Sequence, residues 1–446
     1  MKIGQFLKKN SFKEGDIVEA KKDGTAFTGT IVPSKDQSML ALKLNSGYNI
    51  NIKLDGKTSA KKISEGKGVG KPKPAKLEKK PGLPTVSILQ IGGTIAARVD
   101  YRTGAVFVNY EPEDLIALVP ELGQMANIES RLVSNMFSED MRFAHYKVIA
   151  KEIEKEAKKD IKGIVLPHGT DTMTYTAAAL EFMLKDIQIP VILVGAQRST
   201  DRGSTDAIMN LICAFEFITK TDFVGVGICM HETSEDKCGA ILPPCKTRKM
   251  HTSRRDAFKP VNDTAIARIN FETKKIDFLK DYRKKDPAKK LELLGNIEEK
   301  TALVKVYPNF FAKQIEFFRK NKFKGVVIEG TGLGQAPVGT PNSLCGENKK
   351  IMKEMALLAK SGCIIAMTSQ CIFGAVQMHI YANAVDLVNI GVLPGKDMLP
   401  ETAFVKLAWL LGNYKNKEEI KRLFQTNLRG EINERTPLDS TTPDYN

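Results

Sequence analysis

Apolar residues form short, nearly continuous runs through most of the chain after residue 84. Four of these runs lie at 85–91, 163–168, 190–196 and 224–230. Continuous apolar runs of this length are typical of parallel strands that are buried on both faces. Residues 172–185 and 204–220, which lie between the runs, carry helical patterns. Strands that alternate with helices predict an α/β domain with a doubly wound parallel sheet.

A second, smaller set of strands and helices follows from about residue 300. Its apolar runs lie at 302–308, 325–330 and 363–369, and its helical patterns at 348–360, 400–411 and 417–424. The same alternation predicts a second α/β domain. We therefore expect a large domain over residues 84–298 and a smaller one over residues 299–446.

The first 83 residues have a different pattern. Residues 12–55 contain short, mostly alternating runs that are separated by Gly, Asp, Asn and Ser. This pattern predicts four or five strands in a small SH3-like or OB-like β-barrel, which we assign to residues 1–55. Residues 56–83 are rich in Lys, Gly and Pro, so we expect a flexible linker there.

Composition excludes several classes of protein. No apolar run approaches the roughly 18–20 residues that cross a bilayer, and the N-terminus lacks the apolar segment of a secretory signal. The seven cysteines include no CxxC pair, and the five histidines form no HExxH motif. These counts disfavour a disulfide framework and a metal site. We expect a cytoplasmic protein without a metal of its own.

Positive charge is concentrated near the N-terminus. The formal net charge is +15, and the first 84 residues hold 18 Lys against 8 acidic residues, a net +10. A basic appendage on a nearly balanced body suggests a polyanionic partner such as RNA. A disordered, solubilising arm would have the same composition, so both interpretations stay open.

Polar clusters follow three of the predicted elements. The first strand runs into Gly92-Gly93-Thr94, and the strand at 163–168 runs into Gly169-Thr170-Asp171-Thr172. The third cluster is the basic segment 245–258. Taken singly, these clusters are also explained by a turn, a helix cap and a surface loop. Ligands of parallel sheets, however, bind beyond the carboxyl ends of the strands, where the first two clusters are expected.

Together the clusters supply two hydroxyls, a carboxylate and a lysine. This set is typical of acyl transfer by a hydroxyl nucleophile that uses neither histidine nor a metal. The first cluster matches neither the GxGxxG fingerprint nor the Walker A loop, so nucleotide binding is not supported. Cys371 lacks a convincing histidine partner, which disfavours a cysteine amidohydrolase.

Three motifs resemble those of a known family. The segments IGGTIA, HGTDT and TRKMHT occur in the order found in bacterial-type L-asparaginases and glutaminase-asparaginases, and the resemblance covers roughly residues 85–425. It implies that Thr94 is the nucleophile and that Thr170, Asp171 and Lys249 complete the catalytic group. Lys246 is the competing lysine, although the motif aligns better through Lys249.

The resemblance also implies a substrate-binding set. The segment NMFSEDM (135–141) is similar to the family's substrate-binding segment, with Ser138 expected to hold the α-carboxylate and Glu139 standing where Gln is usual. Tyr101 is the expected tyrosine of the loop after the nucleophile. Backbone N–H groups near Gly93 and Gly169 are expected to hold the oxyanion.

The N-terminal module and the segments 251–258 and 398–413 are most similar to one subfamily, the glutaminase subunits of archaeal Glu-tRNA(Gln) amidotransferases. This resemblance implies glutamine hydrolysis, a homodimeric core, and ammonia transfer to a partner subunit with kinase and transamidase activity. ATP and Mg²⁺ would act in that partner, and no cofactor is expected in this chain. Glu-tRNA(Gln) would be bound through the complex.

Two alternatives stay open. The first is a free-standing asparaginase or glutaminase with an accessory RNA-binding module. The second is a non-catalytic binding protein on the same scaffold, which the complete Thr94, Thr170, Asp171 and Lys249 set disfavours.

Overall fold

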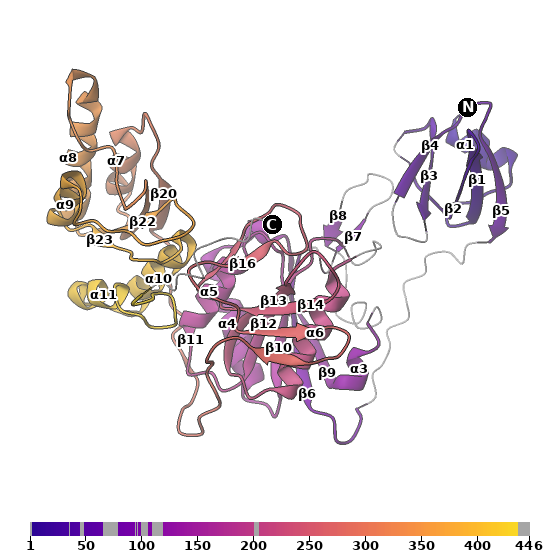
Figure 1. The fold of residues 1–446 in the computed structure, drawn as a ribbon, viewed down its shortest axis with the longest axis horizontal. Helices are drawn as coiled ribbons and strands as arrows, with labels where there is room; N and C mark the ends of the chain where they lie inside the picture. Colours follow the sequence, from indigo (N-terminus) through magenta and orange to yellow (C-terminus); the bar gives the residue numbers. More distant parts are fainter. Residues whose placement is uncertain are drawn as a thin grey trace.

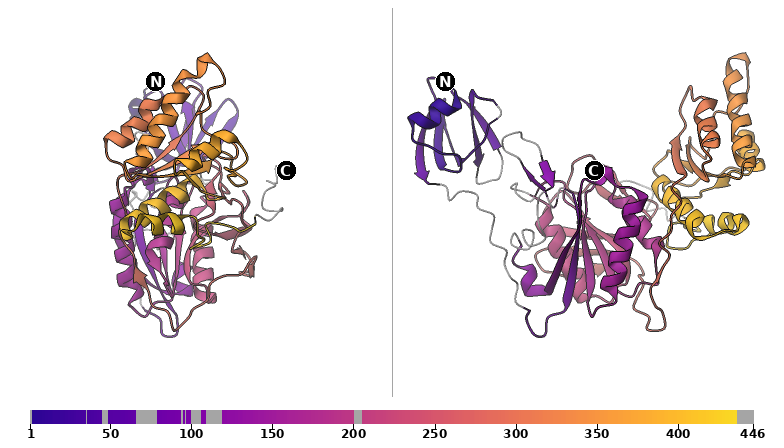
Figure 2. Two further views of the ribbon diagram at one scale, coloured as in Figure 1. Left: turned by 90° about the vertical axis from the view of Figure 1, so that its left-hand side faces the viewer. Right: turned by 180° about the vertical axis from the view of Figure 1, so that it is seen from behind.

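The computed structural model describes residues 2–34, 36–44, 49–65, 79–93, 95, 97–99, 106–108, 119–199 and 205–435. These residues form an N-terminal β domain, a large α/β domain and a C-terminal α/β domain. Figures 1 and 2 show the β domain and the C-terminal domain on opposite sides of the large domain. None of the helices within the described ranges is both long and apolar enough to cross a membrane.

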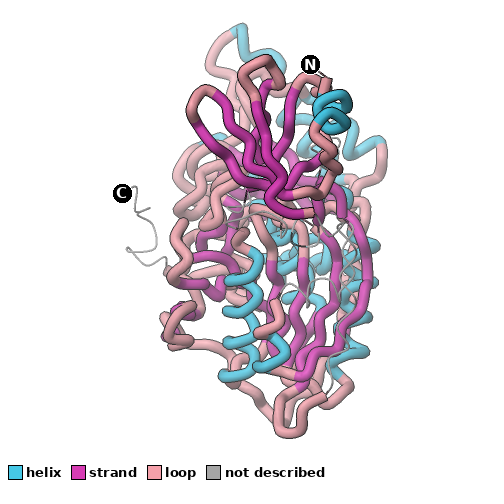
Figure 3. Tube along the Cα trace, turned by 90° about the vertical axis from the view of Figure 1, so that its right-hand side faces the viewer, coloured by secondary structure: helices cyan, strands magenta, loops and turns pink. Residues whose placement is uncertain are grey.

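The N-terminal β domain is an antiparallel sheet with one short helix (Figure 3). Its elements are α1 (Ile3–Lys9), β1 (Ile17–Lys22), β2 (Thr25–Val32), β3 (Met39–Leu44), β4 (Asn49–Lys53) and β5 (Ser59–Ser64). The strands are hydrogen-bonded in the order β4-β3-β2-β1-β5. Val18, Leu40 and Leu42 are buried on the inner face, as the alternating pattern predicts.

The predicted boundary of the linker was wrong, because β5 lies inside the segment 56–83. β5 pairs with β1, and Lys62 Nζ lies 2.8 Å from Asp16 Oδ2. Hydrophobic patterning missed this strand because four of the six residues of its sequence, SAKKIS, are lysine or serine. The described chain resumes at residue 79, and the Lys80 backbone N–H donates to Asn127 Oδ1 at 2.7 Å, which ties it to the large domain. Helix α1 was not predicted either.

The large domain contains an eight-stranded sheet, hydrogen-bonded in the order β18-β17-β14-β13-β12-β10-β6-β9. The elements of this domain are β6 (Thr85–Gly92), β7 (Ala97–Val99), β8 (Val106–Val108), α3 (Leu122–Met125), β9 (Asn127–Met136), η2 (Ser138–Asp140), α4 (Phe143–Ala157), β10 (Gly163–Pro167), α5 (Met173–Met183), β11 (Leu184–Lys185), β12 (Pro190–Val194), α6 (Ala207–Lys220), β13 (Gly225–His231), β14 (Cys238–Leu242), β15 (Thr247–Lys249), β16 (Phe258–Pro260), β17 (Ala267–Asn270), β18 (Ile276–Phe278) and β19 (Glu292–Leu293).

The predicted doubly wound sheet is confirmed. Strands β13, β12, β10, β6 and β9 are parallel, with α4 and α5 packed on one face and α3 and α6 on the other. The predicted strands and helices begin and end within three residues of the observed ones. The antiparallel strands β14, β17 and β18, which extend the sheet beyond β13, were not predicted.

The strand order places a topological switch point beside β6. From β6 the chain passes to β9 on one side and returns to β10 on the other. The connections after β6 and β10 therefore diverge, which opens a crevice at the carboxyl ends of these strands.

The C-terminal domain is the predicted second α/β unit. Its four strands are parallel and lie in the order β20-β21-β22-β23. The elements are β20 (Thr301–Lys305), α7 (Ala312–Lys320), β21 (Gly325–Gly330), η3 (Ser343–Cys345), α8 (Gly346–Lys360), β22 (Ile364–Ser369), α9 (Ala382–Asn389), β23 (Leu393–Pro394), α10 (Pro400–Asn413) and α11 (Lys417–Phe424).

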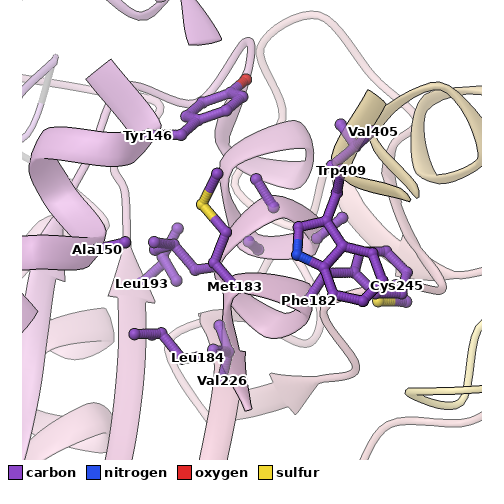
Figure 4. Close-up of a cluster of buried hydrophobic side chains, with 14 of the residues drawn as sticks. Tyr146, Ala150, Phe182, Met183, Leu184, Leu193, Val226, Cys245, Val405 and Trp409 are labelled. Carbon is purple, nitrogen blue, oxygen red and sulfur yellow. The ribbon is translucent and has the colours of Figure 1, made fainter. Parts of the chain in front are cut away.

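Helix α10 joins the two α/β domains through a common core. It packs against β20 and β21 of its own domain and against α5 of the large domain. Figure 4 shows Trp409 of α10 stacked on Phe182 of α5, with ring centroids 5.4 Å apart. The Trp409 indole N–H also donates to the Leu294 carbonyl at 3.0 Å. The two domains therefore fold against each other, with apolar packing across their boundary.

Candidate active site

The carboxyl ends of β6, β9 and β10 meet at the switch point. The Gly93 backbone N–H donates to the Met136 carbonyl at 3.1 Å, which joins the end of β6 to the end of β9. Gly93 has a φ of +83°, and a Cβ on it would lie only 2.2 Å from the Gly169 Cα. Only glycine allows this approach of two backbones. The segment that leads into Thr94 is thus held against the segment that carries Thr170. Thr94 and Tyr101 themselves lie outside the described residues.

Thr170, Asp171 and Lys249 lie together although 78 residues separate Asp171 from Lys249. Lys249 Nζ lies 2.9 Å from Thr170 Oγ1 and 2.7 Å from Asp171 Oδ1. Thr170 is buried, the Lys249 side chain is 14% exposed and the Asp171 side chain is 64% exposed. The amine therefore bridges a buried hydroxyl and a carboxylate that reaches solvent.

Ser138 lies in the turn directly after β9, beside Gly169. Its Oγ accepts a hydrogen bond from the Asp171 backbone N–H at 3.2 Å, and its carbonyl accepts one from the Thr172 hydroxyl at 2.7 Å. A Cβ on Gly169 would lie 2.7 Å from the Ser138 Cβ, so the glycine permits this contact. Ser138 is buried, whereas Glu139 is exposed.

Lys246, the competing lysine, lies in a different environment. Its Nζ is 2.6 Å from Asp397 Oδ2, and both side chains are almost completely buried. The amine also donates to the Asp397 carbonyl at 3.1 Å. The described contacts therefore place Lys246 in the junction with the C-terminal domain, and Lys249 beside Thr170.

His168, in the same motif, was not singled out from the sequence. The ring is completely buried, with Nδ1 2.7 Å from the Gly169 carbonyl oxygen and Nε2 2.9 Å from Thr176 Oγ1. A carbonyl oxygen only accepts hydrogen bonds, so Nδ1 carries the proton and Nε2 is the acceptor in the neutral ring. The ring thereby orients the peptide that precedes Thr170.

Burial of His168 makes stability depend on pH. Desolvation lowers the pKa of His168 from 6.5 to about 4. Because the folded-state pKa is depressed, the unfolded chain binds more protons between these values, and stability falls as the pH falls from 6.5 towards 4. We expect a loss of about 3 kcal/mol in the free energy of unfolding over this range. Urea unfolding at several pH values measures it.

The matched control for this prediction is His168→Asn, which removes the titrating ring. The variant should be less stable at pH 7 but should lose less stability on acidification than the unmodified chain. Equal acid sensitivity of the two chains would assign the effect to other groups.

A second polar network, which was also not predicted from the sequence, supports the loop after β12. Asn210 Nδ2 donates to the Gly195 carbonyl at 3.0 Å, and a Cβ on Gly195 would lie 2.8 Å from the Thr170 Cγ2. His231 Nδ1 lies 2.6 Å from Asn210 Oδ1, and its Nε2 lies 3.0 Å from Asp236 Oδ1. No sequence motif signals this network, because its members come from separate elements.

The described part of the chain contains no group of three or more His, Cys, Asp or Glu residues that could hold a metal. The groups that the described site brings together are the Thr170 hydroxyl, the Asp171 carboxylate and the Lys249 amine.

Comparisons with known proteins identify the family of the chain. Three family models match the chain: "Asparaginase, N-terminal" over residues 85–283, "Glutaminase/Asparaginase C-terminal domain" over residues 300–424, and "GatD N-terminal domain" over residues 12–63. The D subunit of glutamyl-tRNA(Gln) amidotransferase from Pyrococcus abyssi is 45% identical, with 99% of each chain covered. The chain belongs to the GatD family of amidotransferase subunits.

Other members of the GatD family are similarly close. That of Methanococcus maripaludis is 43% identical over 95% of this chain and 99% of its own. Among solved structures, the thermostable L-asparaginase from Thermococcus kodakarensis is 25% identical, with a TM-score of 0.69, and covers 79% of this chain and all of its own. L-asparaginase I from Vibrio cholerae is also 25% identical, with a TM-score of 0.67. The chain is therefore an asparaginase-family hydrolase with the additional N-terminal domain of GatD.

Proposed function

We propose that the chain is the glutaminase component of a tRNA-dependent amidotransferase. It hydrolyses glutamine to glutamate and ammonia, and the ammonia passes to a partner subunit that converts Glu-tRNA(Gln) to Gln-tRNA(Gln). The observation that carries this proposal is the position of the Lys249 amine, within hydrogen-bond distance of both Thr170 Oγ1 and Asp171 Oδ1. The names of the full-length relatives support the assembly.

The proposed reaction begins at a threonine hydroxyl. Thr94 Oγ attacks the carbon of the glutamine side-chain amide, and its proton passes through Thr170 and Lys249 to the leaving nitrogen, which departs as ammonia. The remaining γ-glutamyl ester is hydrolysed by water. A threonine hydroxyl needs a positioned base to act in this way. Thr170 is the alternative nucleophile, and trapping of the ester followed by peptide mapping distinguishes the two.

The Lys249 amine lies 2.7 Å from the Asp171 carboxylate, and the Asp171 side chain is 64% exposed. In the proposed complex the α-ammonium of glutamine binds Asp171, while Ser138 holds the α-carboxylate. The ammonium then competes with Lys249 for the negative charge of Asp171. Substrate binding thereby weakens the contact of Lys249 with Asp171 and leaves its contact with Thr170, where the base is needed.

The chain needs no nucleotide for this step. We propose that ATP and Mg²⁺ act in the partner subunit, where the tRNA-bound glutamate is activated and amidated. The asparaginase resemblance also supports a homodimeric core, which sedimentation of the purified chain tests.

Ammonia release by the purified chain tests the proposed function. We expect slow release from glutamine by the chain alone and stimulation when the partner subunit and Glu-tRNA(Gln) are added. Asparagine is the control substrate and should be used poorly. Strong asparagine hydrolysis, unchanged by the partner or the tRNA, would instead indicate a free-standing asparaginase. The solved relatives are named as L-asparaginases.

A further inference from the structure

A basic hollow lies in the C-terminal domain, at the end of the sheet where β21 and β22 begin. It has a volume of about 380 Å³ and lies between the segment before β21, the turn before β22, and the α10–α11 connection. Lys322, Lys324, Lys415 and Lys417 line it, together with the rings of Phe323 and Tyr414. We call this feature the lysine hollow. The carboxyl ends of the strands lie at the opposite end of the same sheet.

The lysine hollow has an excess of positive charge. Its four lysines are exposed, and none forms an ion pair with a carboxylate of the described residues. Glu298 is the only acidic residue among those that line it, and Glu298 Oε1 accepts a hydrogen bond from the Lys300 backbone N–H at 2.9 Å. The other cation, Arg319, is paired with Glu354 at 2.9 Å. The lysine charges therefore remain largely unbalanced.

The carboxyl ends of neighbouring helices offset only part of this positive charge. Helices α7, α8 and α10 end beside the hollow, at Lys320, Lys360 and Asn413. Each carboxyl end carries roughly half a negative elementary charge. Three ends together offset fewer than two of the four lysines, and Glu298 offsets about one more. A net positive site remains.

The two rings are held in place by neighbouring aromatic side chains. Phe323 packs on Phe318 with ring centroids 5.1 Å apart, and Tyr414 packs edge-on against Trp409 at 5.8 Å. Lys300 Nζ lies 5.5 Å from the centre of the Phe323 ring. Fixed rings beside unpaired amines are suited to nucleic acid, because bases stack on the rings and phosphates contact the amines.

We propose that the lysine hollow binds the phosphate backbone of RNA. The strongly hydrated ammonium groups of lysine suit phosphates as point charges, and the basic chain as a whole favours a polyanion. The choice of tRNA as the RNA rests on the proposed function. The hollow lies away from Lys249 and Thr170, so RNA binding there leaves the glutamine site free.

Paired charge variants of the full chain test the proposal. The hollow variant combines Lys324→Gln, Lys415→Gln and Lys417→Gln. The control variant combines Lys155→Gln, Lys158→Gln and Lys185→Gln, three exposed lysines that are paired with glutamates elsewhere. Both variants lose three positive charges, so the positive N-terminal segment and the change in net charge affect them equally. Filter binding of a labelled tRNA transcript is measured at several salt concentrations.

The hollow variant should bind the tRNA about tenfold more weakly at 0.1 M salt. Its plot of log affinity against log salt should be shallower by about two to three units, since up to three phosphate contacts are lost. The control variant should stay close to the unmodified chain. Equal weakening in the two variants, or none in either, overturns the proposal.

Two further measurements separate this proposal from others. Unchanged tRNA binding by the hollow variant, with weakened binding of the partner subunit, would assign the hollow to an acidic protein surface and overturn the RNA proposal. Both variants should release ammonia from glutamine at the unmodified rate, since none of the six lysines contacts the described site. Absence of this activity in all three chains would reject the proposed function while leaving the RNA result interpretable.

Discussion

Replacing Lys249 with alanine should lower the rate of ammonia release from glutamine by about 10²- to 10⁴-fold, the usual contribution of a general base. The reason is the position of the amine, which lies 2.9 Å from Thr170 Oγ1 and 2.7 Å from Asp171 Oδ1. At this position the amine can accept the proton of the attacking hydroxyl. The side chain is near the surface of the site, so the fold should be retained. Steady-state ammonia release measures kcat and KM separately, and circular dichroism checks folding.

Lys249→Arg is the matched control for charge. A guanidinium keeps the positive charge beside Asp171 but does not give up its proton in a protein. If Lys249 transfers a proton, the arginine variant should be about as inactive as the alanine variant. If it only balances the Asp171 carboxylate, the arginine variant should recover most of the rate, and that recovery would contradict the proposed mechanism.

The part of the fold that could be predicted from the sequence consists of strands formed by continuous apolar runs. Strands β6, β10, β12 and β13 are buried on both faces, so most of their positions are apolar and the pattern is clear, although Ser87 and Gln90 of β6 are buried polar residues. Strand β9 is the edge of the sheet, and its sequence NIESRLVSNM is only partly buried. Such a strand is held by backbone pairing with β6, which leaves little trace in hydropathy.

The candidate site was predicted as three separate segments, and their meeting required the topology. Gly92-Gly93 and the segment after β10 could be placed at strand ends, because parallel strands share one carboxyl edge. The hairpin of β15 and β16, which carries Lys249, is too short to be recognised from periodicity. The choice between Lys246 and Lys249 likewise rested on a motif, since both lysines lie in the same basic segment.

The fold separates those two lysines through a contact 151 residues away in sequence, between Lys246 and Asp397. His168 shows the same limit at short range. Its ring contacts Gly169, the next residue, and Thr176, eight residues further on, but an isolated histidine gives no sign of whether it is buried. Side-chain environment, rather than residue type, decides both cases.

Replacing Lys246 with alanine should reduce the free energy of unfolding by about 3–5 kcal/mol, the usual cost of leaving one partner of a buried ion pair unpaired. The Lys246 amine lies 2.6 Å from Asp397 Oδ2, with the two side chains 0% and 2% exposed. Burial lowers the pKa of the Lys246 ammonium despite the opposing effect of Asp397. Asp397 also accepts hydrogen bonds from the Asn433 backbone and side chain, so its carboxylate would stay buried in the variant. Chemical denaturation measures the loss.

The double variant Lys246→Met and Asp397→Leu separates the ion pair from simple loss of packing. Removing both charges together avoids an unpaired buried carboxylate, and such replacements are often neutral or stabilising. The double variant should therefore recover much of the stability that the single variant loses, although the two Asn433 hydrogen bonds are not restored. Any Lys246 variant that stays folded should still release ammonia from glutamine. A stable but inactive Lys246→Met chain would instead move the proton-transfer role from Lys249 to Lys246, and the contacts of Lys249 with Thr170 and Asp171 would then be structural.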